Sequence, residues 1–467
     1  MKKYLPFLIF AVIAFLLFYK LGDTFLTNWD EAWYADVARN MARTGNLITP
    51  VWNHQPFFDK PPLYYWLSAL SFKVFGVSEF AARFFSALAA LGVCVLTYFL
   101  GRELISKRAG LISAVVVGSS IGFLYRARTG NLDTLLTLWL LLSIYLFYKG
   151  LENAKYFLWM GFFLGLGFLT KGVVVFIFPV LGILWLWQRS WTSQDDKRRM
   201  SFWGTCDSRI YWGVLIGIFI SAAWFLASYF TNGQDFLSGF SHNQFGKVAN
   251  STDLLKSFSL DYIGYLKSGL KVWFLFFVPA FVYALIKWRD RKVLLLSFFV
   301  IYFGILSISE NKSNWFLVPL FPIVALMIGQ LMEFFRWKWV IGLVVVVALF
   351  QVYHFRAEFI VPETERDEVR VAEAAKNLTN PETPIYLTGL SYPTTIFYSE
   401  RKSFATYGGG YSKGAWWVLP ESSWSEILKT PVYIITTNQE FNDNKYFKDY
   451  NFQTLYQSGD RKLIKRL

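Results

Sequence analysis

The apolar residues of this chain are gathered into long blocks, and this grouping limits the fold more than any other feature. A block of about 20 apolar residues can cross a bilayer as one helix. Eleven blocks are candidate spans: Leu5–Tyr19, Phe80–Leu100, Ala109–Tyr125, Leu132–Tyr148, Tyr156–Thr170, Val173–Trp187, Ile210–Phe230, Val272–Ile286, Val293–Ser307, Trp315–Glu333 and Trp339–Phe355. With 55% hydrophobic and 17% charged residues, the chain is neither disordered nor composed like an ordinary soluble enzyme. The sequence therefore predicts an α-helical polytopic membrane protein.

The basic residues predict how these spans are oriented. The net charge of +14 lies entirely in residues 1–359, because residues 360–467 hold 13 basic and 13 acidic side chains. Many basic residues fall in the short inner loops, which are every second loop between spans, such as those containing 197–199 and 287–292, and this is the positive-inside pattern. This pattern favours membrane orientation over nucleic-acid binding. We expect a multi-pass protein of the plasma (inner) membrane with a cytoplasmic N-terminus.

The outer side then holds the two longest loops and the C-terminal region. We expect residues 1–359 to form a transmembrane module with catalytic outer loops at 20–79 and 231–271, and residues 360–467 to form a small extracytoplasmic α/β or α+β domain. The expected strands of this domain are Pro384–Leu387, Thr394–Tyr398, Ala415–Leu419 and Pro431–Thr436, and its expected helices are Arg366–Leu378 and Ser423–Leu428.

Two adjacent carboxylates, Asp30 and Glu31, follow the first span and lie between Trp29 and Trp33. Acidic residues at the start of a helix are ordinary capping residues. Their position at the level of the lipid headgroups makes a catalytic role the alternative. The same loop contains Lys60 just before two prolines, which fit the start of a second helix. A lysine beside backbone N–H groups suits a phosphate, and a lysine snorkelling to the interface is the equal alternative.

Further charged residues interrupt apolar sequence on the outer side. Asp133 lies at the mouth of a span, where a carboxylate is costly and usually functional. Arg126 and Arg128 precede it and could make it a structural ion pair. Lys171 breaks an apolar run that is too long for one span, so the chain is expected to re-enter the membrane there. His242 and Lys312 lie in outer loops, where a lone basic residue is most often simply solvated.

Taken together, these residues suit the transfer of a sugar from a lipid-linked phosphate. All of them face one side of the membrane, and aromatic residues surround them. A carboxylate can act as general base on an acceptor hydroxyl, while lysines and arginines can bind a phosphate and stabilise it as a leaving group. A transporter or flippase of a lipid-linked saccharide is the alternative, but it should show two related halves with discontinuous helices, and none is evident. A structural membrane protein would not need this one-sided cluster.

The same residues resemble motifs of the GT-C superfamily of membrane glycosyltransferases, and in particular the bacterial aminoarabinose (lipid A) transferases and the protein O-mannosyltransferases. The matching stretches are Asp30-Glu31, Lys60-Pro61-Pro62-Leu63, Phe75–Arg83, Leu132-Asp133, Phe168–Gly172, Trp224-Phe225, His242-Asn243 and Ser307–Lys312 with Pro319 and Pro322. They cover roughly residues 20–325 in the family's order, and as a set they are specific.

The resemblance implies an inverting hexosyl- or pentosyltransferase that uses a polyprenyl-phosphate-linked donor at the outer face. It implies Asp30, Glu31 and Asp133 as catalytic residues, and Lys60, Arg128, Lys171, His242 and Lys312 as substrate- or phosphate-binding residues. The acceptor can be a lipid, a glycan or a protein. No His or Cys pattern demands a metal, although a divalent cation could bind the outer-face carboxylates.

Overall fold

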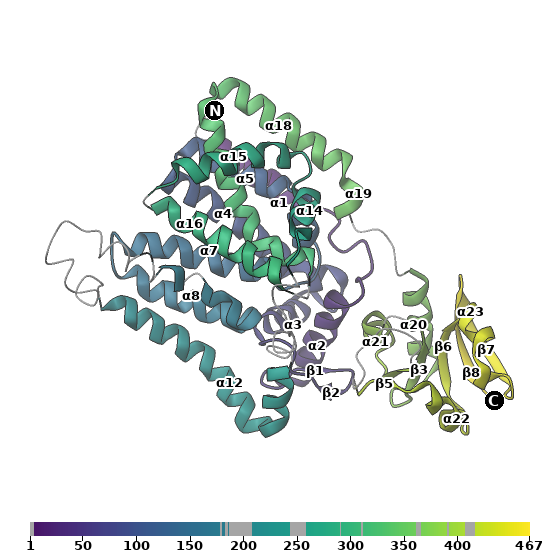
Figure 1. Ribbon diagram of the computed structural model, residues 1–467. Helices are drawn as coiled ribbons and strands as arrows, with labels where there is room; N and C mark the ends of the chain where they lie inside the picture. The colour runs from purple at the N-terminus through teal and green to yellow at the C-terminus, as the bar shows by residue number, and fades with distance from the viewer. Residues whose placement is uncertain are drawn as a thin grey trace.

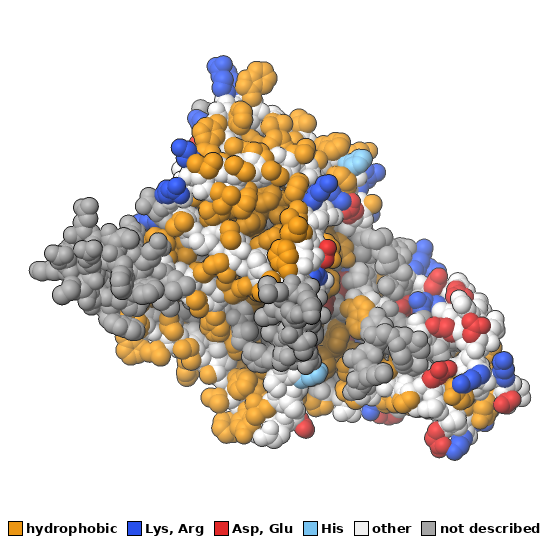
Figure 2. Space-filling view, in the orientation of Figure 1, with side chains coloured by type: hydrophobic (Ala, Val, Ile, Leu, Met, Phe, Trp, Pro, Cys, Tyr) orange, Lys and Arg blue, Asp and Glu red, His pale blue; other side chains and the backbone are white. Residues whose placement is uncertain are grey.

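The computed structural model describes most of the chain, in ten segments: residues 4–177, 180–182, 185, 208–242, 258–289, 291–309, 312–360, 366–389, 392–406 and 416–467. It consists of a bundle of apolar helices with a sheet-containing C-terminal domain at one side (Figure 1). The outside of the bundle is covered by hydrophobic side chains, whereas charged side chains gather on the C-terminal domain (Figure 2). This division is the one expected of an integral membrane protein that carries a water-exposed domain.

Each expected span that is fully described coincides with a helix. These helices are α1 (Leu5–Phe18), α4 (Glu79–Leu104), α5 (Lys107–Ser119) with α6 (Ile121–Ala127), α7 (Asp133–Gly150), α8 (Tyr156–Lys171), α12 (Arg209–Ser241), α15 (Trp273–Lys287), α16 (Arg291–Ile308), η3 (Asn314–Leu320) with α17 (Phe321–Leu331) and η4 (Met332–Phe334), and α18 (Trp337–His354). The span expected at Val173–Trp187 lies partly outside the described residues. Only the 3-10 helix η1 (Gly172–Phe176) is complete there.

By length and composition, five helices of the described part can each cross a membrane: α4, α12, α16, the run Asn314–Phe334 and α18. The pair α5 and α6 is bent by 66° and makes a sixth if it counts as one broken span, while α1, α8 and α15 are shorter apolar helices. The total of eleven spans stays a prediction. The expected break at Lys171 is present, because α8 ends there and Gly172 adopts a positive φ of 76°.

Glycine spacing brings two of these helices into close contact. Gly161 and Gly165 of α8 are four residues apart, as are Gly213 and Gly217 of α12, so each helix carries a small-xxx-small face. A Cβ atom built on Gly161 would lie 1.7 Å from the carbonyl oxygen of Gly213. The helices can approach this closely only because both positions lack a side chain.

The loop between α1 and α4, residues 20–78, folds into its own small layer. It contains α2 (Asp30–Thr44), the short hairpin β1 (Val51–Trp52) and β2 (Gln55–Pro56), and α3 (Leu63–Phe75). Both helix starts agree with the sequence, since α2 begins at Asp30 and α3 begins directly after the two prolines. Two further helices, α14 (Asp261–Leu270) and α19 (Arg356–Phe359), lie at the same end of the bundle as α6. The site is built at this end.

The C-terminal domain contains one six-stranded sheet in the order β5-β4-β3-β6-β8-β7. Strands β3 (Ile385–Thr388), β4 (Ser403–Thr406), β5 (Val418–Leu419) and β6 (Tyr433–Thr437) are parallel, whereas β7 (Phe452–Ser458) and β8 (Arg461–Arg466) form an antiparallel hairpin. The helices are α20 (Arg366–Leu378), α21 (Tyr392–Ser399), α22 (Trp424–Ile427) and α23 (Asn438–Asp443), with short 3-10 turns η5 (Glu421–Ser423) and η6 (Lys445–Phe447).

One expectation for this domain is wrong. Thr394–Tyr398 belongs to helix α21 rather than to a strand. Its β-branched residues favour a strand only as an isolated segment. In the structure Pro393 falls at the start of the helix, where proline is well tolerated, and α21 packs on α2. Tertiary contact therefore decides the conformation of this segment.

Polar contacts fix the C-terminal domain to the loop between α1 and α4. The backbone N–H of Leu26 donates to the Tyr398 hydroxyl at 2.8 Å, and this hydroxyl donates to Glu79 at 2.7 Å. Asn53 makes two hydrogen bonds of 2.8 Å to the backbone of Ser403. The segment that leads into α2 is thus held between the bundle and the C-terminal domain.

Candidate functional site

A row of four charged side chains lies where α2, α6, α7 and α8 meet, and we call it the Asp30–Lys171 row. Arg126 Nη2 lies 3.5 Å from Asp30 Oδ2 and 2.6 Å from Asp133 Oδ2. On the other side of Asp133, Lys171 Nζ lies 2.5 Å from Oδ1. The row therefore joins Asp30, Asp133 and Lys171, which were predicted from the sequence as site residues. Arg126, which was not among the predicted site residues, links Asp30 to Asp133.

Helix ends place these four side chains. Asp30 is the first residue of α2 and Asp133 is the first residue of α7, so both carboxylates lie at the positive end of a helix dipole. Lys171 is the last residue of α8, at the negative end of its dipole. Aromatic rings cover the two cations: Arg126 lies 5.1 Å from the Trp315 ring centroid and Lys171 lies 4.7 Å from that of Phe316.

Asp30 is the exposed carboxylate of the row. Its side chain keeps 36% of its surface accessible, compared with 3% for Asp133. Partial burial raises the pKa of Asp30 above the ordinary carboxyl value. The Arg126 guanidinium opposes this rise, and the negative charge of Asp133 adds to it. An accessible carboxylate with a raised pKa is a stronger base than a solvated one, so Asp30 is suited to accept a proton from a bound ligand.

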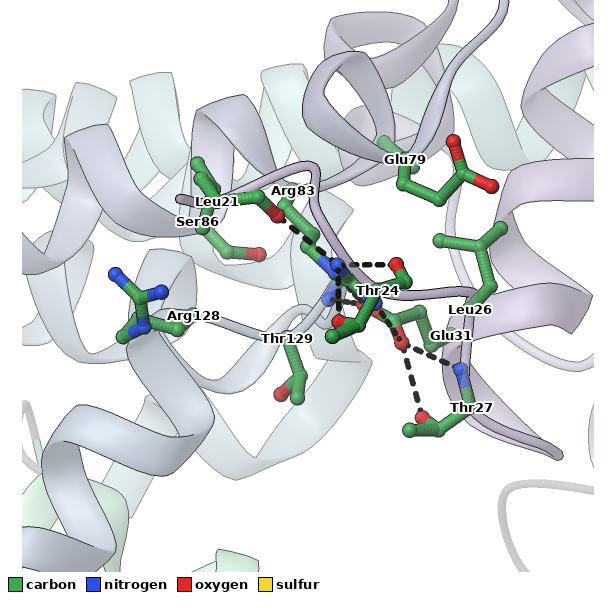
Figure 3. Close-up of polar contacts among 12 residues, drawn as sticks. Leu21, Thr24, Leu26, Thr27, Glu31, Glu79, Arg83, Ser86, Arg128 and Thr129 are labelled. Atoms are coloured by element: carbon green, nitrogen blue, oxygen red, sulfur yellow. Dashed lines mark hydrogen bonds and ion pairs between the residues drawn. The ribbon is translucent and has the colours of Figure 1, made fainter. Parts of the chain in front are cut away.

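Glu31 lies next to Asp30 in sequence but faces another environment (Figure 3). Arg83 donates to both of its carboxylate oxygens, at 2.7 and 3.1 Å, and the backbone N–H groups of Thr27 and Gly130 donate at 2.7 and 2.6 Å. Burial alone would raise the pKa of Glu31, but the Arg83 charge and these hydrogen bonds outweigh it and hold the pKa below the ordinary value. With 2% exposure, this carboxylate braces the start of α2 rather than facing a ligand.

Lys60 lies just before α3 and pairs with its neighbour in sequence. Its Nζ is 3.0 Å from Asp59 Oδ2, and both side chains are mostly buried, with 17% and 16% exposure. Asp59 is close enough to Asp30 for its charge to contribute to the raised pKa of Asp30. Lys60 is therefore near the Asp30–Lys171 row, although no described contact joins it to the row.

The structure contradicts a phosphate-binding position for Arg128. Its guanidinium is turned to the end of α1, where it donates to the carbonyl oxygens of Leu16 and Leu17 at 2.7 and 3.1 Å, and to that of Phe359 at 3.2 Å. Only 4% of Arg128 is exposed, and Figure 3 shows it apart from the Glu31–Arg83 cluster. Arg128 satisfies carbonyl groups at the end of a helix, which is a structural task.

The two remaining predicted residues lie outside the row. His242 is exposed at the end of α12, and within the described structure no contact connects it to Asp30 or Asp133. Lys312 is partly buried just before η3, next to Ser313, whose N–H donates to the Tyr262 hydroxyl at 3.2 Å. Their assignment as phosphate-binding residues stays a prediction.

Sequence reasoning missed the central position of Arg126. It identified both Arg126 and Arg128 beside Asp133, but chose Arg128 for the site. Arg126 lies in the last turn of α6 and Arg128 follows directly after this helix, where residues two apart point to nearly opposite sides. Only one of the two arginines could therefore face Asp133, and the sequence did not show which one it was.

Both carboxylates of the row are paired with cations. Asp30 and Asp133 both contact Arg126, and Asp133 also contacts Lys171. No group of three or more His, Cys, Asp or Glu side chains with ligand-like spacing occurs among the described residues. A divalent cation bound at these carboxylates would have to displace the ion pairs, and such a cation stays a prediction.

The residue directly before Asp30 is strained. Trp29 adopts φ 64° and ψ −120°, a conformation suited to glycine and unfavourable by about 1 to 3 kcal/mol for other residues. Such strain collects at functional sites. It sets the direction in which α2 begins and hence the direction of the Asp30 side chain.

This strain predicts an order of stability for two variants. Trp29→Gly and Trp29→Ala both remove the indole ring, but only glycine relieves the backbone. We expect the glycine variant to be more stable by about 1 kcal/mol, after allowing for the greater entropy that glycine loses on folding. Equilibrium unfolding of the two purified variants in the same detergent tests this order. An alanine variant at least as stable as the glycine variant would contradict it.

Comparison of the sequence with known proteins gives consistent matches. Residues 59–198 match the family model described as dolichyl-phosphate-mannose-protein mannosyltransferase. An uncharacterized protein of Aquifex aeolicus is 32% identical over 337 residues, which are 71% of this chain and 64% of that protein. Undecaprenyl phosphate-alpha-4-amino-4-deoxy-L-arabinose arabinosyl transferase 1 of Pseudomonas fluorescens is 28% identical over 345 residues, 68% of this chain and 58% of the transferase. The chain thus spans less than two thirds of both relatives.

Comparison of the structure extends over nearly the whole chain. The crystal structure of ArnT from Cupriavidus metallidurans in the apo state has a TM-score of 0.80 at 17% identity, covering 99% of this chain and 98% of that one. The oligosaccharyltransferase of Archaeoglobus fulgidus in the apo form has a TM-score of 0.62 at 12% identity, covering 98% and 74%. At these identities the likeness shows a shared fold.

Proposed function

We propose that this chain, a GT-C membrane glycosyltransferase of the aminoarabinose transferase and protein mannosyltransferase type, moves a monosaccharide from a polyprenyl-phosphate-linked donor to an acceptor, with inversion. The observation that carries the proposal is the Asp30–Lys171 row. It places an accessible carboxylate 3.5 Å from an arginine, with a second cation beyond Asp133. The proposed transfer needs a general base next to groups that bind an anion.

The residues of the row take separate roles in this proposal. Asp30 is the general base. Arg126 and Lys171 stabilise the phosphate of the donor, and Lys60 at the head of α3 contributes a third cation. Asp133 is a positioning residue, because it holds both cations of the row at 2.6 and 2.5 Å. Glu31 supports Asp30 indirectly by fixing the first turn of α2.

The proposed reaction is a single displacement. The acceptor oxygen gives its proton to Asp30 and attacks the anomeric carbon. The bond from that carbon to the phosphate oxygen breaks, and polyprenyl phosphate leaves with the electron pair. Attack opposite to the leaving group inverts the anomeric configuration. The cations stabilise the negative charge that gathers on the departing phosphate.

The proposed location is the outer face of the plasma (inner) membrane. The basic inner loops support a cytoplasmic N-terminus, which places the first outer loop and the C-terminal domain outside. The proposed lipid carrier is undecaprenyl phosphate. The name of the Pseudomonas fluorescens relative contains this lipid, and a second structure of ArnT from Cupriavidus metallidurans is bound to it.

Lipid analysis of cells tests the function. Cells that lack this chain should accumulate one polyprenyl-phosphate hexose or pentose, because the donor is made but not consumed, and expression of the chain should remove it. Mass spectrometry of extracted polyprenyl-phosphate lipids measures both changes. If no lipid-linked sugar responds to loss or return of the chain, the proposed donor is wrong.

A further inference from the structure

A cavity of about 470 Å³ is lined by one member of the Asp30–Lys171 row, Arg126. Its wall contains the exposed residues Ser268 of α14 and Glu358 of α19, and at the inner end the buried Arg126 of α6. This volume is within the range of small-molecule sites. The same Arg126 guanidinium lies 3.5 Å from Asp30. Arg126 therefore connects a ligand in the cavity with the proposed base.

We propose that this cavity binds the acceptor, and that the reacting group of the acceptor is the hydroxyl of an uncharged sugar. The inference rests on the proposed function and specifies its acceptor. The sugar can belong to a free oligosaccharide or to a glycolipid, since both present the same hydroxyl.

The lining of the cavity suits an uncharged polar ligand. It offers hydroxyl and amide groups from Thr27, Tyr125, Ser268 and Asn314. Its two charged residues already have partners: Glu358 Oε1 lies 2.9 Å from Lys271 Nζ, and Arg126 contacts two carboxylates. The Nε–H of Arg126 is buried without a hydrogen-bond partner in the described structure, which leaves one donor for a ligand oxygen.

The charge balance of the site argues against a phosphate as acceptor. Lys60, Arg126 and Lys171 carry three positive charges, and Asp59, Asp30 and Asp133 carry three negative ones. The predicted phosphate contact of Lys312 adds one positive charge to this set, and the donor phosphodiester adds one negative charge. A phosphate monoester as acceptor would add about 1.5 to 2 more at pH 7, and uncompensated charge in a partly buried site is strongly unfavourable. A hydroxyl adds none.

The acceptor can be tested before it is identified. Full-length protein is given the donor lipid from cells that lack the chain, together with the remaining glycolipids and soluble glycans of these cells as separate fractions. Alkaline phosphatase removes phosphate monoesters from an acceptor fraction, and periodate destroys its vicinal hydroxyls. We expect phosphatase to leave transfer unchanged and periodate to abolish it, and the active fraction shows whether the sugar is lipid-linked. Loss of transfer after phosphatase would overturn the inference while confirming transfer, and so would transfer to the proteins of these cells, offered as a further fraction. No use of the donor with any of these fractions would refute the proposed function.

Three substitutions at Ser268 test the cavity itself. Ser268→Trp should raise KM for the acceptor fraction at least tenfold, because the indole fills the entrance. Ser268→Asp and Ser268→Lys both lose the serine hydroxyl, so each should raise that KM. The two values should agree within threefold, because an uncharged ligand does not respond to the sign of a nearby charge. A phosphate acceptor would instead bind more weakly to the aspartate variant and more tightly to the lysine variant.

Ile263→Trp is the matched control. Ile263 is exposed on the same helix and is not part of the cavity wall, so this variant should keep the KM of the unmodified protein. Melting temperatures of all four variants show that they are folded. An unchanged KM in Ser268→Trp would show that the acceptor does not bind in the cavity. Opposite shifts of KM in the two charged variants would show that the acceptor is charged.

Discussion

Asp30→Asn is expected to lower the rate of sugar transfer by about 10²- to 10⁴-fold, the usual contribution of a positioned general base. Asparagine keeps the shape of the side chain but cannot accept the proton of the acceptor hydroxyl. The donor should still bind, because Lys60, Arg126 and Lys171 are unchanged. Release of polyprenyl phosphate from purified donor, measured with saturating acceptor, gives the rate, and KM for the donor should stay within a few-fold.

Asp23→Asn is the control for this substitution. Asp23 belongs to the same outer loop, but its side chain is 54% exposed and its partner is Lys20 at 3.4 Å, a surface pair of little energetic weight. The control should transfer sugar at the normal rate. Full activity in Asp30→Asn, or an equal loss in both variants, would show that Asp30 is not the base.

The pH dependence of the unmodified protein gives independent evidence on the same residue. A base must be deprotonated to act, so transfer should fall as the pH drops through the pKa of Asp30. Burial raises this pKa above the ordinary carboxyl value of 3.8, so the loss should begin at a higher pH than for a solvated aspartate. An acid limb at or below the ordinary value would contradict the environment described for Asp30.

The sequence predicted the features that local rules control. Long apolar blocks predicted the helices, and acidic residues and prolines predicted where α2 and α3 begin. Asp133 and Lys171 were identified because charges are rare in apolar sequence, and Asp30 because two adjacent carboxylates follow the first span between tryptophans. Their meeting in space depends on the packing of four helices, which no local pattern in the sequence determines.

The errors come from positions that only packing decides. Arg126 and Arg128 have the same chemistry and lie two residues apart, and the orientation of α6 sends one to Asp133 and the other to the end of α1. Glu31 and Asp30 diverge in the same way, because adjacent residues on a helix point about 100° apart. In the C-terminal domain, the hairpin of β7 and β8 was missed because its polar strands alternate too weakly to be recognised.

The pair of Glu31 and Arg83 leads to the second large effect, this time on stability. Arg83→Gln should lower the free energy of unfolding by about 3 to 5 kcal/mol, because it leaves the Glu31 carboxylate buried without its cation. The side chains are 2% and 1% exposed, so water cannot replace the lost partner. Arg83 also donates to the carbonyl groups of Leu21, Thr24 and Phe25, which then lose their donors too. Equilibrium unfolding in mixed micelles measures the change.

A double-mutant cycle separates the ion pair from these carbonyl contacts. Glu31→Gln in the Arg83→Gln background should cost much less than Glu31→Gln alone, because the buried charge is then already unpaired. Glu152→Gln, at an exposed pair with Lys149, should leave stability unchanged.

Because the pKa of Glu31 is depressed in the folded state, the ion pair of Glu31 and Arg83 stabilises the protein above the ordinary carboxyl value of 4.5. This stability is lost as the pH falls through the folded pKa. The single Glu31→Gln variant should lack that acid-dependent loss. In the double-mutant cycle, additive effects of the two substitutions would show that Glu31 and Arg83 do not stabilise the start of α2 as a pair.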